Sequence, residues 1–114
     1  MEQVQEEQAF NEAITGQKPT VALFKTTWCK DCHYLDVFLP QILLKYAEQI
    51  HFVEVDRDEL MDVCEKYNVL GIPSFIAFTA GREILRFVSK LRKTQAEVEL
   101  FLDRVIEVSK ALAK

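Results

Sequence analysis

The chain lacks features that mark several classes of protein. Its three cysteines in 114 residues are an odd number and too few for a scaffold held together by disulfides. It has no run of 18 apolar residues, so no segment is predicted to span a membrane. A formal net charge of −4 repels phosphate backbones, so we expect no nucleic-acid partner. Without repeats, low-complexity tracts or linkers, residues 1–114 are expected to form one domain.

The remaining composition is that of an ordinary folded protein. Hydrophobic residues make up 49% of the chain and charged residues 28%, which is enough to bury a core. Residues 1–10 carry acids and glutamines where a secretory signal needs a basic start and an apolar stretch. We therefore expect a cytoplasmic protein, or the mature form of a protein whose signal has been removed. In a reducing cytosol, a Cys-x-x-Cys pair is more often catalytic or metal-binding than a structural disulfide.

Strand patterns and helix patterns alternate along the chain. Apolar and β-branched runs bounded by turn residues predict strands at 20–26, 51–56, 71–79 and 83–89, with a weak edge strand at 2–4. Apolar residues at helical spacing predict helices at 5–15, at 31–48, within 57–69, and from the capping-box sequence at 94–97 onward. This order predicts an α/β fold with a central mixed β-sheet and helices on both faces.

Two of the cysteines lie in the segment TTWCKDCH, residues 26–33. Cys29 and Cys32 form a Cys-x-x-Cys pair, and His33 follows directly, a pattern shared by haem attachment, half of a zinc site and a redox dithiol. Haem attachment normally needs export and a second axial ligand in a wrapping fold, which this sequence does not indicate. Zinc needs two further ligands, but there is no second Cys-x-x-Cys and no histidine pair at ligand spacing.

The position of the pair favours the redox interpretation. Cys29 follows a strand of the buried type and stands at the start of a long predicted helix. Free backbone N–H groups and the helix dipole stabilise a thiolate there. Cys32 comes one turn later, where its thiol can attack a mixed disulfide formed by Cys29. Cys64, on the apolar face of a later helix, is expected to be an inert buried thiol.

The chain also resembles the thioredoxin family over roughly residues 5–108. The residues that carry the resemblance are Trp28-Cys29-Lys30-Asp31-Cys32 and Gly71-Ile72-Pro73, supported by the strand end and turn at 78–81. The aspartate before the second cysteine is similar to that of small cytosolic thioredoxin-like proteins with a Trp-Cys-x-Asp-Cys active site. The resemblance implies the thioredoxin fold, Cys29 as the nucleophile and Cys32 as the resolving thiol.

Further roles follow from the resemblance alone. Pro73 is expected to follow a cis peptide bond beside the cysteines, and Ile72 to offer its backbone to an extended substrate. Trp28 is expected to form part of the docking surface. The family's buried aspartate falls at Leu23, and its lysine partner near Phe52, so both charges are replaced by apolar groups. The loss removes the base expected to accept the proton of the resolving cysteine.

Three residues around the cysteines are candidates to tune the thiols. The positive charge of Lys30 favours a Cys29 thiolate, whereas the negative charge of Asp31 opposes it. Either Asp31 or His33 could take the place of the missing base, and adjacency to Cys32 favours Asp31. A surface position without a role is the alternative for His33.

The sequence thus predicts a thiol–disulfide oxidoreductase, with a reductase as the main expectation. Its substrates would be protein disulfides or adducts of low-molecular-weight thiols, and its electrons would come from a reductase or a thiol pool. We expect a monomer with no bound cofactor or metal and no membrane partner. The alternative is a binding or adaptor module with this fold and a slow or idle dithiol, because fold alone does not fix function.

Overall fold

The computed structural model describes residues 1–113, whose apolar runs pair into a sheet with strand order β1-β3-β2-β4-β5. The strands are β1 (Glu2–Val4), β2 (Thr20–Lys25), β3 (His51–Asp56), β4 (Ser74–Thr79) and β5 (Arg82–Phe87). The first three in the spatial order pair in parallel, and β4 and β5 are antiparallel to their neighbours. The predicted mixed sheet is therefore confirmed, including the weak edge strand at the N-terminus.

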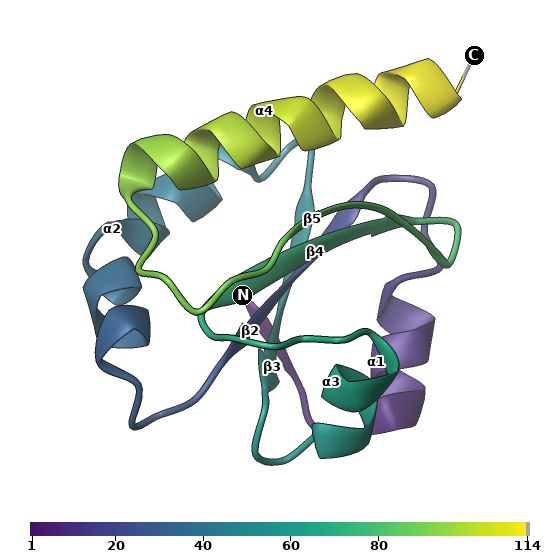
Figure 1. Ribbon diagram of the computed structural model, residues 1–114. Helices are drawn as coiled ribbons and strands as arrows, with labels where there is room; N and C mark the ends of the chain where they lie inside the picture. Colours follow the sequence, from purple (N-terminus) through teal and green to yellow (C-terminus); the bar gives the residue numbers. More distant parts are fainter. Residues whose placement is uncertain (114) are drawn as a thin grey trace.

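Helices cover both faces of the sheet, as predicted (Figure 1). They are α1 (Glu7–Ala13), α2 (Lys30–Tyr46), α3 (Met61–Lys66) and α4 (Gln95–Leu112). The helices α2 and α4 pack on one face over Leu23, Phe52 and Phe75. The other face carries α1 and α3, and its apolar cluster includes Phe10 and Phe24. Among residues 1–113, no helix combines the length and apolar content needed to cross a membrane.

Local sequence signals explain several boundaries. The Thr94 hydroxyl accepts a hydrogen bond from the backbone N–H of Glu97, and the Glu97 carboxylate accepts one from the Thr94 N–H. This capping box starts α4 at the predicted place. Ala80 and Gly81 both have positive φ, +50° and +80°, as a two-residue hairpin turn between twisted strands requires. The helix α2 continues through Pro40.

The fold brings three segments to one end of the sheet. The strand β2 ends at Lys25, and α2 begins five residues later, after the segment that holds the first cysteine. The strand β4 begins at Ser74 rather than at 71, because residues 71–73 form the turn that precedes it. The loop at 88–94 joins β5 to α4. The candidate site lies where these three segments meet.

Candidate active site

Cys29 and Cys32 lie together at the N-terminus of α2, as the sequence predicts. Cys29 is the N-cap residue, and its Sγ accepts a hydrogen bond from the backbone N–H of Cys32 over 3.2 Å. Cys29 keeps 7% of its surface exposed, whereas Cys32 is fully buried. The first thiol therefore has access to a substrate and to the helix N–H groups that stabilise a thiolate, while the second lies behind it.

The environment of Cys32 holds its thiol in the protonated form. Burial raises the pKa of Cys32 to about 12, and its interaction with Cys29 acts in the same direction. A hydrogen bond from the backbone of Thr26 and the charge of Lys25 act against this rise in pKa. At neutral pH, Cys32 must lose a proton before it can attack a disulfide, because the thiolate is the nucleophile.

The segment before β4, residues 71–73, contributes Ile72 to the buried cluster that contains both cysteines. The Ile72–Pro73 peptide bond is cis, as the family resemblance implies, and both residues are buried. Gly71 packs against the loop that follows β5, so closely that a Cβ atom at this position would lie 2.3 Å from the backbone oxygen of Ser89. Only glycine fits this contact, which fixes the Gly-Ile-Pro segment against the loop at 88–94.

Trp28 is exposed and yet held in place. It keeps 61% of its surface accessible, which is consistent with the predicted docking role. Its indole Nε1 donates a hydrogen bond to Asp58 Oδ2 over 2.7 Å, and the Arg57 guanidinium lies 5.4 Å from the ring centroid. These two partners come from the segment between β3 and α3, and sequence reasoning did not assign them this role.

The three predicted tuning residues lie around the first turn of α2. Lys30 is exposed. Asp31 accepts a hydrogen bond from the Nε of Arg92 over 3.0 Å, which directs its carboxylate toward the loop before α4. His33 Nε2 lies 2.6 Å from the backbone oxygen of Thr27. A carbonyl oxygen can only accept, so Nε2 carries the proton in this contact.

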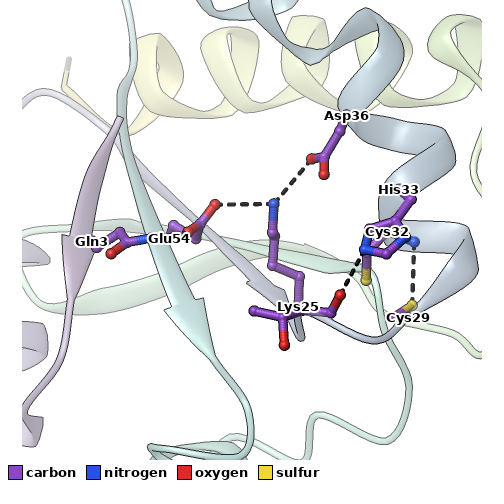
Figure 2. A network of polar contacts seen from close by, with 8 residues as sticks. Gln3, Lys25, Cys29, Cys32, His33, Asp36 and Glu54 are labelled. Carbon is purple, nitrogen blue, oxygen red and sulfur yellow. Dashed lines mark hydrogen bonds and ion pairs between the residues drawn. The ribbon is translucent and has the colours of Figure 1, made fainter.

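Leu23 and Phe52 are buried in the same apolar cluster beneath α2 and α4. A charged network lies beyond them on the same two strands (Figure 2). Lys25 Nζ, at the end of β2, lies 2.9 Å from Asp36 Oδ1 of α2 and 3.2 Å from Glu54 Oε1 of β3. Burial lowers the pKa of Lys25, but the two carboxylates outweigh it and raise the pKa overall. Sequence reasoning missed this network.

Lys93 was also missed, because a lysine is rarely buried. Its side chain is 1% exposed, and its Nζ donates hydrogen bonds to the backbone oxygens of Ser89 and Leu91 and to Ser89 Oγ, over 3.0–3.2 Å. Burial lowers the pKa of Lys93, and the nearby Cys32 thiol raises it. The buried Lys93 amine thus links oxygen atoms of the 88–94 loop by hydrogen bonds, close to the dithiol.

Cys64 lies on α3, away from the N-terminus of α2. It is 5% exposed, and burial raises its pKa to about 11. A buried thiol with a raised pKa is a poor nucleophile, as predicted for this cysteine.

A family model described as Thioredoxin matches residues 2–103. The chain belongs to the thioredoxin family. Thioredoxins are thiol–disulfide oxidoreductases that act on disulfide substrates, so this chain is an enzyme of that class. The position of the cysteine pair, before a long helix and beside a cis proline, agrees with this assignment.

Two curated thioredoxins and one solved structure illustrate the likeness. The chain is 42% identical to thioredoxin of Echinococcus granulosus over 76 residues, 67% of this chain and 70% of that protein. It is 27% identical to the chloroplastic thioredoxin Y of Oryza sativa over 103 residues, 90% of this chain but 60% of the length of the rice protein. The crystal structure of thioredoxin from Trypanosoma brucei brucei superposes with a TM-score of 0.81 at 22% identity, covering 92% of this chain and 89% of that one.

Proposed function

We propose that this thioredoxin-family protein reduces disulfides through the dithiol of Cys29 and Cys32. The observation that carries the proposal is the contact between them. Cys29 Sγ caps the helix and accepts the Cys32 N–H, while Cys32 lies one turn further into the protein. The first thiol is therefore suited to attack and the second to resolve. The substrates proposed are protein disulfides and mixed disulfides of low-molecular-weight thiols.

The reaction has two exchange steps. The Cys29 thiolate attacks one sulfur of the substrate disulfide, forming a mixed disulfide and releasing the other sulfur as a thiolate. Cys32 then loses its proton and attacks Cys29 Sγ, which forms the Cys29–Cys32 disulfide and frees the second substrate thiolate. The substrate gains two electrons, and a reductase or a thiol pool returns two electrons to the enzyme.

The docking surface proposed for the substrate surrounds Cys29. Trp28 contributes an exposed ring that Asp58 holds in place. Ile72, which precedes the cis bond to Pro73, belongs to the same buried cluster as the two cysteines, and this supports an extended peptide pairing with its backbone. A monomer is enough for this site, since the residues named come from one chain.

A second candidate function is that of a binding module with an idle dithiol. The apolar side chains of Leu23 and Phe52 favour it, because neither can accept the proton of Cys32. Reduction of insulin by dithiothreitol distinguishes the two functions. We expect the wild-type protein to accelerate this reaction, Cys64→Ser to retain the acceleration and Cys29→Ser to abolish it. Equal rates for the wild-type protein and Cys29→Ser would favour the binding module.

The direction of electron flow is tested by the reduction potential of the cysteine pair. A reduction potential of about −270 mV would fit a reductant of the thioredoxin type, whereas a potential of about −120 mV would fit an oxidant. A cytoplasmic location belongs to the same proposal, because a reductant needs a compartment that keeps its dithiol reduced. Fractionation of cells, with detection of the untagged protein, tests the location separately.

A further inference from the structure

Cys32 needs a proton acceptor that its apolar surroundings do not supply. It is fully buried in the apolar cluster that includes Phe24 and Ile72, and the apolar Leu23 stands where the family has its buried aspartate. The charge of Lys25, at the end of β2, acts on its thiol, and Lys93, in the loop before α4, interacts with it. Lys25 in turn pairs with Glu54 on β3 and Asp36 on α2, and Asp31 on α2 pairs with Arg92. The carboxylates paired with Lys25 are therefore the candidates to receive the proton.

Glu54 lies on the same face of the sheet as the apolar pair. Side chains alternate along a strand, so Lys25 shares a face with Leu23, and Glu54 shares a face with Phe52. The side chains of Lys25 and Glu54 are only 17% and 16% exposed. Glu54 is held at both oxygens, by Lys25 Nζ at Oε1 and by Gln3 Nε2 at Oε2 over 2.7 Å. The half-buried ion pair of Lys25 and Glu54 therefore lies two residues beyond Leu23 and Phe52 on the same strands, at the end of the sheet that precedes the cysteines.

The charged network includes a residue of α2, the helix that carries Cys32. Asp36, the second carboxylate partner of Lys25, follows Cys32 by four residues and lies on the same side of the helix. Figure 2 shows Lys25 extending between Glu54 and Asp36, with Cys32 one turn before Asp36 on the same helix. The charge of Lys25 lowers the pKa of Cys32, so the ammonium group stabilises the thiolate that resolution requires.

A pocket beside Glu54 is lined by Lys25 and Thr26, the two residues that lower the pKa of Cys32. It has a volume of about 260 Å³, and its lining includes Lys25, Thr26 and Glu54. The backbone of Thr26 acts to lower the pKa of the Cys32 thiol. Thr26 Oγ1 is buried and, among residues 1–113, has no hydrogen-bond partner in the protein. A pocket of this size with polar lining residues has room for water, and Thr26 is one of those residues.

We propose that Glu54 accepts the proton of Cys32 through water in this pocket, with Lys25 as the positioning residue. The inference rests on the proposed function, because it concerns the second exchange step. As the Cys32 sulfur attacks Cys29 Sγ, its proton passes through water to Glu54, and the bond between Cys29 and the substrate sulfur breaks. The freed substrate thiolate carries the electron pair of that bond. Glu54 then returns its proton to solvent or to this thiolate, so no further reactant is needed.

Apart from Asp36, which shares Lys25 with Glu54, the other carboxylates considered have different partners. Asp31 accepts a hydrogen bond from Arg92. Asp56, which also lines the pocket, accepts hydrogen bonds from the backbone N–H groups of Asp58 and Glu59. Glu59 lines the same pocket and has no contact with Lys25. Glu59 is therefore a matched control for Glu54.

The test uses dithiobis-nitrobenzoate as the disulfide, in a Cys64→Ala background, followed by stopped flow. Attack by Cys29 releases the first coloured thiolate, and resolution by Cys32 releases the second. We expect Glu54→Gln to slow the second release about 10²-fold, the lower end of general-base effects, and to leave the first within a factor of about two. Lys25 keeps Asp36 as a partner in this variant, so no cation is stranded. Glu59→Gln should change neither release.

The pH profile gives a readout that a structural role would not change. Without an internal base, the second release depends on the free Cys32 thiolate, so its logarithm should rise with pH at a slope of about one in Glu54→Gln. The wild-type profile should be flatter near neutral pH, and Glu54→Asp should restore much of that flatness. A wild-type slope of about one, or equal slowing of both releases in Glu54→Gln, would overturn the inference. A wild-type protein without a second release would instead refute the proposed reductase.

Discussion

Trp28 donates its indole N–H to the Asp58 carboxylate over 2.7 Å, while most of its ring surface faces solvent. The hydrogen bond fixes the orientation of a large apolar surface next to Cys29, and the guanidinium of Arg57 lies over the same ring. A docking surface that is ordered before a partner arrives costs less conformational entropy on binding. We therefore predict that Asp58 acts on substrate binding through Trp28 and not on the chemistry of the thiols.

Asp58→Ala should weaken docking without slowing attack. We expect KM for a protein disulfide to rise about three- to tenfold, because a hydrogen bond to a charged group contributes roughly 1–2 kcal/mol and this one is partly exposed. The rate constant kcat should change little. Steady-state kinetics on insulin measure both, and Asp58→Asn, which keeps an acceptor oxygen, is the control. A fall in kcat with constant KM would contradict this role.

Cys29 should be the thiol that iodoacetamide alkylates first in the reduced protein near neutral pH. Exposure alone does not separate it from Cys64, since the two are 7% and 5% exposed. The difference lies in ionisation, because burial raises the pKa values of Cys32 and Cys64 to about 12 and about 11, whereas Cys29 caps a helix. Peptide mapping over time measures the order of labelling. Labelling of Cys64 as fast as Cys29 would contradict the prediction.

Cys32→Ser should trap substrates as stable mixed disulfides. The attacking thiol remains in this variant, but no second thiol can displace the substrate from Cys29. Affinity capture followed by elution with reductant should release covalent partners. The matched control is Cys29→Ser, in which Cys32 is fully buried and protonated. Equal trapping by the two variants would reverse the proposed roles.

Gly71→Ala should destabilise the protein by about 1–3 kcal/mol, the usual cost of forcing extra atoms into a packed region. The added methyl group would lie 2.3 Å from the backbone oxygen of Ser89, and backbone cannot move aside as a flexible side chain can. Denaturant unfolding measures the change. Gly16→Ala is the control, because its nearest neighbour would be the Lys18 oxygen at 3.7 Å. Equal denaturation midpoints for Gly71→Ala and the wild-type protein would show that the 88–94 loop accommodates the methyl group without a loss of stability.

The reduced protein should lose stability in alkali, in part through Cys64. The unfolded chain ionises this thiol near its ordinary pKa of 9.0, whereas the folded thiol resists until about 11. Between these values the unfolded state binds fewer protons, so the free energy of unfolding falls as pH rises, by up to about 1.4 kcal/mol per pH unit. Cys64→Ala should show a shallower fall in unfolding free energy over this range. Parallel curves for the two proteins would contradict the assignment.

Local patterns were sufficient to predict much of the fold. The strand at 51–56 has the predicted bounds, because alternating apolar residues and the following charged turn limit it on both sides. The start of α4 was equally clear, since Thr94 and Glu97 satisfy each other within one turn. The position of Cys29 at a helix N-terminus followed from the strand before it and the apolar spacing after it.

The charged groups near the site could not be predicted in this way. Lys25 and Glu54 meet because β2 and β3 are neighbours in register, and strand pairing is not visible in either segment alone. The sequence favoured Asp31 as the substitute base by adjacency, but its carboxylate contacts Arg92 from a loop 61 residues away. From the sequence, a lysine at position 93 is expected to be exposed. Only the fold of the 88–94 loop supplies the hydrogen-bond acceptors that allow Lys93 to be buried.

The two edges of the sheet offer little to a strand from another molecule. The strand β1 has only three residues, and β5 presents Arg82, Glu83 and Arg86 as exposed charged side chains. A register irregularity between Ala77 and Phe78, where β4 meets β5, further disturbs the regular ladder. Short, charged and irregular edges are the devices by which β-proteins avoid aggregation. The disulfide-bonded chains proposed as substrates would therefore meet the cysteines without a long, regular sheet edge to which their strands could add.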